Sequence, residues 1–298
     1  MHYYVNSNYF FKEKFGAKVY KLALDGGFSC PHRDKNNQGG CIFCSQGGSG
    51  EFAQKKLLTI DEQIDKAIKL VESKKPKKFI AYFQSFTNTY GPIEKLEETF
   101  YPAINHPKIS ALSIATRPDC LSLQVVELLN KLNQIKPLFI ELGLQTSNEE
   151  VAKFINRGYE NEVYLNGIKK LKEINVNVIT HLIIGLPNCS LQDEIASLNF
   201  AINAKTDGIK LQLLHVLKDT KLAQIYLNNG FKTLEMNEYI SRLIELVKLV
   251  PQKVVIHRLT GDAPKKLLIS PKWSADKKVV LNAINKAFKE NDIKLKEN

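Results

Sequence analysis

Short runs of apolar residues alternate along the chain with longer stretches in which apolar residues recur every three or four positions. A short apolar run indicates a buried strand, and the longer period indicates an amphipathic helix. The strand–helix unit occurs six times: strands are expected at residues 19–24, 78–84, 109–115, 138–144, 177–184 and 208–214, and helices at 59–73, 92–104, 122–133, 148–155, 162–174, 191–204 and 221–227. Thr59 with Glu62 forms a capping-box pattern, which predicts where the first of these helices begins.

Repeated strand–helix units imply parallel strands joined by right-handed crossovers. Because the strands are almost continuously apolar, we expect both of their faces to be covered. Six units fit either an open doubly wound sheet or a barrel, and they are too few for a closed eight-stranded barrel. After Gly230 the alternation weakens, and the pattern predicts a helix at 235–249, a short strand at 253–257 and a helix at 279–289.

The composition is that of a globular protein, with 44% hydrophobic and 24% charged residues. It excludes a wholly disordered chain and a disulfide-stapled miniprotein. Residues 1–20 lack the apolar segment that a signal peptide needs. The longest uncharged stretch, residues 175–192, contains His181, Gly185 and Pro187, so it is a poor membrane helix. We therefore expect a cytoplasmic protein without a membrane partner.

The charge balance is basic, because 42 Lys and Arg against 31 Asp and Glu give a net charge of +11. Such a balance fits a polyanionic partner such as nucleic acid, and it equally fits a lysine-rich soluble surface. Basic runs at residues 74–78, 169–172 and 265–266 would suit phosphate contacts. The alternative for each run is a solvated helix end.

Three of the five cysteines lie within 15 residues, directly after the first predicted strand: Cys30, Cys41 and Cys44. In a reducing compartment, clustered cysteines indicate a metal or catalytic site. They could ligate three corners of an iron–sulfur cluster, or part of a zinc tetrahedron with His32 as the fourth ligand. Ligands gather at the carboxyl ends of parallel strands, and a cluster with three protein ligands leaves one iron open. This position favours the catalytic cluster over structural zinc.

Several motifs together carry a family resemblance. They lie at residues 24–31, 39–44, 82–90, 116–121, 141–146, 185–187, 258–262 and 271–273. With them the chain resembles the radical S-adenosylmethionine (SAM) enzymes, in the branch related to the Elongator catalytic subunit and the anaerobic coproporphyrinogen oxidase. Within that branch it is similar to the bacterial YtqA/YhcC-like family. The cysteine spacing of ten residues and then two is typical of this branch.

The resemblance implies an α/β fold, a partial six-stranded (βα)6 TIM-like barrel. Residues 1–230 would form the radical SAM core with an N-terminal lead-in, and residues 231–298 a family-specific C-terminal extension packed on it. It further implies two cofactors, a [4Fe–4S] cluster and SAM. The resemblance makes Cys30, Cys41 and Cys44 the ligands of the cluster. The amino and carboxylate groups of SAM would chelate the fourth iron.

Other residues are SAM contacts by the same resemblance: Phe43 near the adenine, Gln84, Thr87 and Asn88 near the amino group, and Gln145 with Arg157 at the methionine part. For Asn88 a plain turn former is an equal interpretation, and for Arg157 the alternative is a surface charge at a helix end. His181 stands where relatives carry Asp, so it either replaces that ribose contact or is a core histidine.

Two further sets of residues have less specific predictions. Cys120 and Cys189 have no partner at ligand spacing and are interpreted as structural thiols. The candidate substrate contacts, none with an assigned chemical role, are His215, His257, Arg258, Asp262 and Trp273.

The implied chemistry is reductive cleavage of SAM to methionine and a 5′-deoxyadenosyl radical, which takes a hydrogen atom from the substrate. Some YtqA-like members, called MnmL, are linked with the wobble uridine of tRNA, whose carboxymethylaminomethyl group they convert to aminomethyl. We therefore expect tRNA as partner, an electron donor such as flavodoxin or ferredoxin, and a methyltransferase acting on the product. The alternatives are a radical SAM enzyme on a small metabolite and a zinc-stabilised RNA-binding protein without catalysis.

Overall fold

Six strand–helix units form the centre of the computed structural model, which describes residues 2–33, 39–48, 53 and 58–296. Their strands are β2 (Val19–Leu24), β3 (Lys78–Phe83), β4 (Ile109–Thr116), β5 (Leu138–Gln145), β6 (Asn177–Ile184) and β7 (Gly208–Leu213). The helices that follow them are α2 (Ile60–Val71), α3 (Ile93–Asn105), α4 (Leu123–Ile135), α5 (Glu149–Phe154), α6 (Asn161–Glu173), α7 (Leu191–Asn203) and α8 (Lys221–Leu227). The capping box of α2 is confirmed, since the Thr59 side chain accepts from the Glu62 amide.

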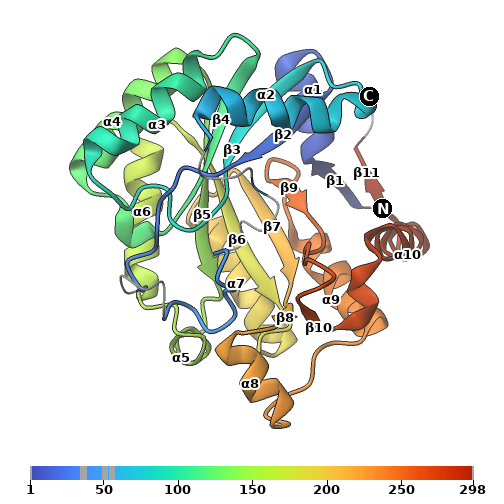
Figure 1. Ribbon diagram of the computed structural model, residues 1–298. Coiled ribbons are helices and arrows are strands. Elements are labelled where there is room, and N and C mark those ends of the chain that lie inside the picture. Colours follow the sequence, from blue (N-terminus) through green and yellow to red (C-terminus); the bar gives the residue numbers. More distant parts are fainter. Residues whose placement is uncertain (1, 34–38, 49–52, 54–57, 297–298) are drawn as a thin grey trace.

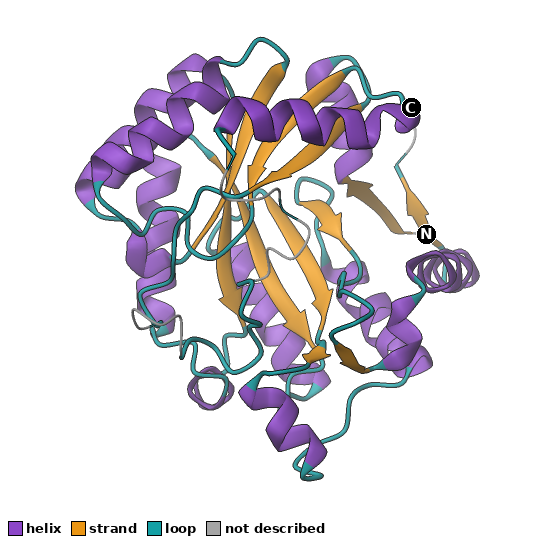
Figure 2. Cartoon of the chain, viewed as in Figure 1, coloured by secondary structure: helices purple, strands orange, loops and turns teal. Residues whose placement is uncertain are grey.

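These strands are parallel neighbours in chain order, and they curve into a partial barrel (Figure 1). Figure 2 shows the helices around the outside of the strands. The predicted fold class is thereby confirmed. No helix among the described residues has the length and apolar character needed to cross a membrane.

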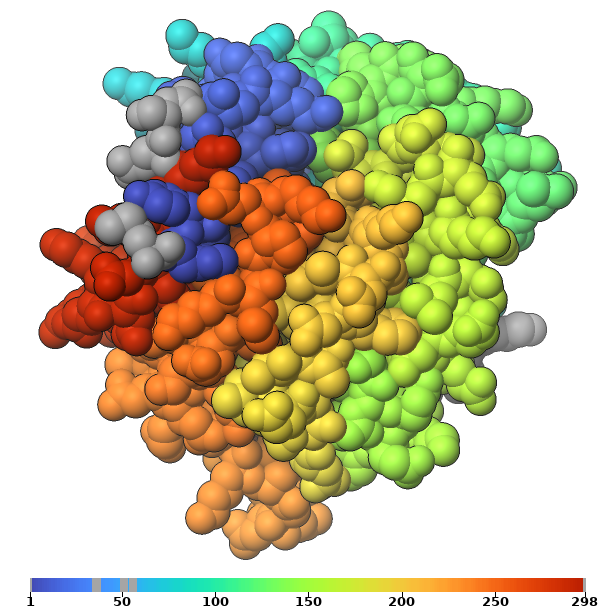
Figure 3. Space-filling model, turned by 180° about the vertical axis from the view of Figure 1, so that it is seen from behind, coloured from blue at the N-terminus to red at the C-terminus, as the bar shows by residue number. Residues whose placement is uncertain are grey.

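The sheet is larger than the sequence pattern predicted, because it continues past β7 through β9, β1 and β11. The elements outside the six units are β1 (His2–Asn6), α1 (Ser7–Phe15), β8 (Val216–Leu217), α9 (Met236–Leu249), β9 (Val255–Arg258), β10 (Leu268–Ser270), α10 (Lys277–Glu290) and β11 (Ile293–Leu295). The two ends of the chain pair in parallel, with His2 opposite Ile293, and Figure 3 shows these blue and red segments side by side. Strands of three to five residues give too little periodicity for β1 and β11 to be expected.

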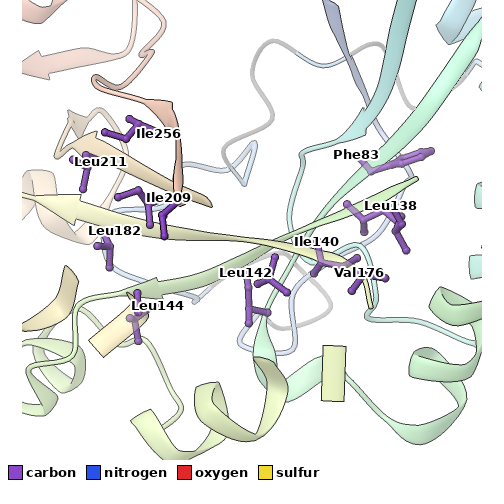
Figure 4. Close-up of a cluster of buried hydrophobic side chains, with 14 of the residues drawn as sticks. Phe83, Leu138, Ile140, Leu142, Leu144, Val176, Leu182, Ile209, Leu211 and Ile256 are labelled. Atoms are coloured by element: carbon purple, nitrogen blue, oxygen red, sulfur yellow. The ribbon is translucent and has the colours of Figure 1, made fainter. Parts of the chain in front are cut away.

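Side chains alternate between the two faces of each core strand. In β5, Leu138, Ile140, Leu142 and Leu144 point to the helix side, where Figure 4 shows them together with residues of β6 and β7. Each leucine buried in this way stabilises the fold by roughly 1.5–3 kcal/mol. The residues between them in the sequence face the barrel interior.

The interior is closed at the amino ends of the strands by an apolar plug from α1. Phe11 packs there with Ile80, Ala111, Phe139 and Ile179. Its ring meets that of Phe139 edge to face, with centroids 5.4 Å apart. This end is filled, so a ligand can enter the interior from the carboxyl ends of the strands. This is the end at which parallel α/β folds bind their ligands.

Candidate active site

A cavity of about 230 Å³ lies at the carboxyl ends of the strands. It brings together nine of the ten residues that the sequence assigned to the cluster or SAM: Cys30, Cys41, Phe43, Cys44, Gln84, Thr87, Gln145, Arg157 and His181. They come from the loops after β2 and β3, from the last residue of β5, from the turn between α5 and α6, and from β6 itself. Residues 115 positions apart in the chain thus share one wall, as Cys30 and Gln145 do.

The cysteine loop is fastened to the barrel by backbone hydrogen bonds around its thiols. The Ile42 amide donates to the Ile155 carbonyl at 3.0 Å, and the Ile42 carbonyl accepts from the Leu222 amide at 2.9 Å. Ile42 is buried between these partners, while the thiols beside it remain partly accessible. A hydrogen bond with the Cys44 thiol lowers the pKa of Cys41, and the positive charge of Arg117 acts in the same direction.

These residues fit an iron–sulfur cluster better than a zinc ion. Among the described residues, no three His, Cys, Asp or Glu side chains converge on a point that could hold one metal ion. A zinc tetrahedron needs such convergence, whereas each cysteine of a [4Fe–4S] cluster binds a different iron. Three thiols on the rim of one cavity, one with a lowered pKa, suit the cluster.

Asn88, a candidate SAM contact, does not line the cavity. Its Nδ2 donates to the carbonyls of Phe83, Ser85 and Ala115 at 3.1, 3.1 and 3.0 Å. The side chain therefore ties the loop after β3 to β4, as the turn interpretation expects. Thr87, one residue earlier, does line the cavity, and its contact with SAM stays a prediction.

Arg157 is not a surface charge, because its side chain is only 1% exposed. Its guanidinium donates to the carbonyls of Tyr159, Leu144 and Thr146 at 2.8, 3.2 and 2.7 Å. It also pairs with Glu149 at 3.1 Å. Arg157 thus holds the loop after β5 together from inside, and a direct contact with SAM stays a prediction.

Gln145 ends β5 with an unusual backbone, at φ 63°. Its Oε1 is buried and has no hydrogen-bond partner among the described residues. Gly143 leaves room for this amide, since a Cβ there would lie 3.0 Å from the Gln145 Nε2. A buried acceptor without a partner at the cavity wall fits a site for a ligand's donor group.

The sequence analysis assigned no role to Arg117, which supports the same wall. Its guanidinium forks onto Asp119 at 2.9 and 2.7 Å and donates to the Arg157 carbonyl at 2.9 Å. It also lies over the Tyr159 ring, 4.8 Å from the centroid. Arg117 lies within the sequence motif at residues 116–121, and this was the signal that could have identified it.

A buried charged network inside the barrel was also missed. Glu141 Oε1 accepts from Lys21 at 2.6 Å and from Ser113 at 2.8 Å. Glu141 Oε2 accepts from Tyr82 and contacts His181 Nε2, each at 2.8 Å, and pairs with Lys210. Charged residues within otherwise apolar parallel strands were the signal that could have revealed the network.

The network sets the charges of its members. Burial alone would raise the pKa of Glu141, but Lys21 and Lys210 hold it well below its usual range. Burial lowers the pKa of Lys210 to about 7 and that of His181 to about 4. His181 also contacts Gln212 at 3.4 Å through Nδ1, so both of its ring nitrogens have protein partners. It has the contacts of a satisfied core histidine, and the ribose contact stays a prediction.

The five candidate substrate contacts separate into two groups. His215, Arg258 and Asp262 line the cavity. His257 instead packs on Phe11 at the closed end of the barrel, with ring centroids 5.6 Å apart. Trp273 donates to the Leu234 carbonyl and is not among the lining residues.

Cys120 and Cys189 also lie outside the cavity lining. Burial raises the pKa of each thiol to about 12. Both are therefore protonated at neutral pH, unlike a metal-ligating thiolate.

Comparison with known proteins identifies the class. The model of the radical SAM superfamily matches residues 29–201, and that of the Radical_SAM C-terminal domain matches residues 206–290. The chain therefore belongs to the radical SAM superfamily.

Its relatives include uncharacterized protein YtqA of Bacillus subtilis, 41% identical over 285 residues, which cover 95% of this chain and 88% of YtqA. Protein YhcC of Escherichia coli is 30% identical over 282 residues, which cover 94% of this chain and 90% of YhcC. Among solved structures, Elp3 of the archaeon Methanocaldococcus infernus superposes with a TM-score of 0.67 at 20% identity. That match covers 79% of this chain and 60% of Elp3, and it shows the shared fold.

Family membership establishes the coarse function. The protein is a radical SAM enzyme whose cofactors are a [4Fe–4S] cluster and SAM, and whose reaction begins with reductive cleavage of SAM. Membership of this superfamily favours the enzyme over the zinc-stabilised RNA-binding protein. That Cys30, Cys41 and Cys44 are the cluster ligands remains a prediction, consistent with their common place on the cavity rim.

Proposed function

We propose that this enzyme acts on tRNA and converts the carboxymethylaminomethyl group of the wobble uridine to aminomethyl. The observation that carries the proposal is the charge of the cavity. Five basic side chains line it, Arg33, Arg117, Arg157, Lys210 and Arg258, against two carboxylates, Glu141 and Asp262. Arg117 and Arg157 also pair with Asp119 and Glu149 outside the lining, whereas Arg258 shares its carboxylate, Asp262, with Lys277. Such a lining favours an anionic substrate, and the modified uridine carries both a phosphate and a carboxylate.

The cluster and SAM, when bound, supply the 5′-deoxyadenosyl radical, and the chain's own residues position the reactants. The three cysteines would hold the cluster at the rim formed after β2. Thr87 and Gln145 would orient SAM from the loops after β3 and β5. The part of the cavity lined by β6, β7 and β9 is then left for the substrate. The apolar plug of α1 closes the other end of the barrel to water.

The proposed target is the methylene between the amine and the carboxylate of the modified uridine. Both neighbours stabilise a carbon radical there, so its C–H bond is weakened. In the proposed reaction this carbon would lose a hydrogen atom to the 5′-deoxyadenosyl radical, and then a proton and one electron, with the oxidised cluster as the electron acceptor. Water would hydrolyse the resulting imine to the primary amine, and the carboxymethyl unit would leave as glyoxylate. A wobble base lies in a single-stranded loop, from which it can turn out into an enzyme's pocket.

Surface lysines near the cavity also support a polyanionic partner. The Lys218 amide donates to the Leu267 carbonyl at 2.8 Å, which joins the loop after β8 to the basic pair at 265–266. Lys218, Lys221, Lys265 and Lys266 are all exposed. They lie beside Leu217, a lining residue of the cavity, and could contact phosphates of the anticodon stem.

The other two basic runs give no such support. Residues 74–77 precede β3 and Lys78 is its first residue, so this run lies at the closed end of the barrel. On α6, Lys172 pairs with Asp207 at 2.7 Å and Lys170 donates to the Leu121 carbonyl at 3.0 Å. These lysines have partners within the protein.

Mass spectrometry of tRNA nucleosides tests the proposal. Cells lacking the protein should accumulate the carboxymethylaminomethyl nucleoside and lose the aminomethyl and methylaminomethyl products. Re-expression of the wild type should restore them, and re-expression of the Cys41→Ala variant should not. An unchanged nucleoside profile under both anaerobic and aerobic growth would contradict the tRNA substrate and would favour a small metabolite.

A further inference from the structure

The cavity has two parts with different walls. The first is formed by the cysteine loop and the loops after β3, β4 and β5, where the predicted SAM contacts lie. The second is formed by side chains of β6, β7 and β9 and the residues after them: His181, Gln212, Leu214, His215, Arg258 and Asp262. Figure 1 shows β9 beside β7 at this side of the barrel. Apart from His181, the second part has no contact assigned by the SAM motifs.

Arg258 is placed on this wall by the sheet register. It lies opposite Lys210 in the parallel pairing of β9 with β7. Lys210 faces the interior, where it pairs with Glu141. Both side chains line the cavity, and Arg258 therefore extends the basic wall beyond the last strand of the six-unit core.

Arg258 differs from the other two arginines that come from the strand ends. Arg117 and Arg157 use their guanidinium groups in several hydrogen bonds to the protein. Within the described part of the chain, Arg258 has one ion pair, from Nη2 to Asp262 Oδ2 at 3.4 Å, and no hydrogen bond. Most of the N–H donors of this guanidinium are therefore available to a ligand.

The neighbouring acidic group neutralises Arg258 only in part. Asp262 Oδ2 lies closer to Lys277 Nζ, at 2.7 Å, so two cations share one carboxylate. The side chain of Arg258 is 26% exposed, so an incoming anion can reach it. Positive charge without a full counter-charge at the wall of a cavity attracts an anionic group.

His215 supplies a second unsatisfied group on the same wall. Its Nε2 is buried and has no hydrogen-bond partner among the described residues. Gly261 leaves space for the ring, because a Cβ there would lie 2.4 Å from the His215 Cε1. Burial lowers the pKa of His215 to about 4, so the ring is neutral and can donate one hydrogen bond.

We propose that Arg258, with His215 beside it, binds the carboxylate of the substrate and so selects a carboxymethylamine over the product amine. This assignment rests on the proposed function and names the group by which the substrate is recognised. A guanidinium matches the two oxygens of a carboxylate in a planar fork, which a lysine cannot do. Once the carboxymethyl unit is removed, the product lacks this contact and is released more easily.

The test compares two anticodon stem-loop RNAs that differ only at the wobble base. One carries 5-carboxymethylaminomethyluridine and the other 5-aminomethyluridine. Their affinities are measured under anaerobic conditions by fluorescence anisotropy, using the full chain with its cluster and SAM. Wild type should bind the carboxylate RNA roughly 10- to 100-fold more tightly, the range for a charged hydrogen bond. Arg258→Gln should abolish that preference, and Arg258→Lys should retain only part of it.

Lys248→Gln is the matched control, because it removes one positive charge from an exposed site on α9. It should lower both affinities equally and keep the preference. Cluster content of each variant reports folding, and Arg258→Lys provides the test if Arg258→Gln fails to assemble. Equal affinity of wild type for the two RNAs, or an undiminished preference in both Arg258 variants, would overturn the assignment.

Conversion of the carboxylate RNA is followed in parallel samples to which a reductant is added. Conversion by wild type without a carboxylate preference would contradict only the role of Arg258. Absence of conversion in a preparation that cleaves SAM would contradict the proposed function. The two failures are therefore distinguishable.

Discussion

His181 Nε2 lies 2.8 Å from Glu141 Oε2 at the wall of the cavity. The contact joins β6 to β5 and belongs to a network in which one buried carboxylate pairs with two lysines, the buried Lys210 and the half-buried Lys21. A buried carboxylate with this many partners holds the barrel interior in one arrangement. Its removal leaves the hydrogen-bond and ion-pair partners around it unsatisfied.

We predict that Glu141→Gln destabilises the protein by about 3–5 kcal/mol, because the lysines are left without their counter-charge in the interior. Chemical denaturation of the purified variant measures the free energy of unfolding. Glu150→Gln is the control. It breaks a pair with Lys153 at 3.1 Å in which the Glu150 and Lys153 side chains are 84% and 72% exposed, so solvent screens the pair and the loss of stability should be far smaller. Equal losses in the two variants would contradict the role of the network.

Stability should depend on pH through His215. Its pKa is about 4 in the folded protein and near the usual 6.5 in the unfolded chain, so the unfolded state binds the extra proton first as pH falls. The free energy of unfolding should therefore fall as pH drops from about 6.5 toward 4, by about 2 kcal/mol at pH 5 from this group alone. His215→Gln should remove that share of the decline. Parallel curves for variant and wild type between pH 7 and 5 would argue against it.

Cluster assembly should require three of the five cysteines. Replacing Cys30, Cys41 or Cys44 with Ala should abolish iron and sulfide binding and SAM cleavage. Cys120→Ala and Cys189→Ala should retain both, because burial keeps these thiols protonated and they lie outside the cavity. Iron and sulfide analysis after anaerobic purification measures the outcome. A Cys41→Ala protein with full iron content is incompatible with the assignment.

Gln145 and Arg157 should separate ligand binding from stability. Gln145→Ala removes a buried amide whose oxygen has no protein partner, so SAM affinity should fall about 3- to 10-fold with little change in stability. Arg157→Ala removes a guanidinium with several protein acceptors, so the free energy of unfolding should fall on the order of 3 kcal/mol. SAM titration and thermal denaturation of both variants distinguish the two roles. Stability losses of the same size would contradict the distinction.

The sequence by itself determined the strand–helix alternation and the place of the cysteine loop. Both are local properties: periodicity follows from how each segment alternates buried and exposed positions, and the three cysteines fall within 15 residues. The capping box of Thr59 and Glu62 was predictable for the same reason, since its partners are three residues apart. The family motifs identified the chemistry because they too are short segments.

Only the tertiary structure decided which distant residues meet. Lys21 and Glu141 are 120 positions apart, and Lys210 meets Arg258 through the register of two strands that are separated by several other elements. The sequence left two interpretations of Arg157, a ligand contact or a surface charge, because a sequence does not show which acceptors surround a guanidinium. Its burial in the structure excluded the surface charge. The basic runs were equally ambiguous, since the end of the barrel at which a lysine lies depends on strand direction. Contacts of this kind follow from sheet register and curvature, which are set by packing of the whole chain and not by any one segment.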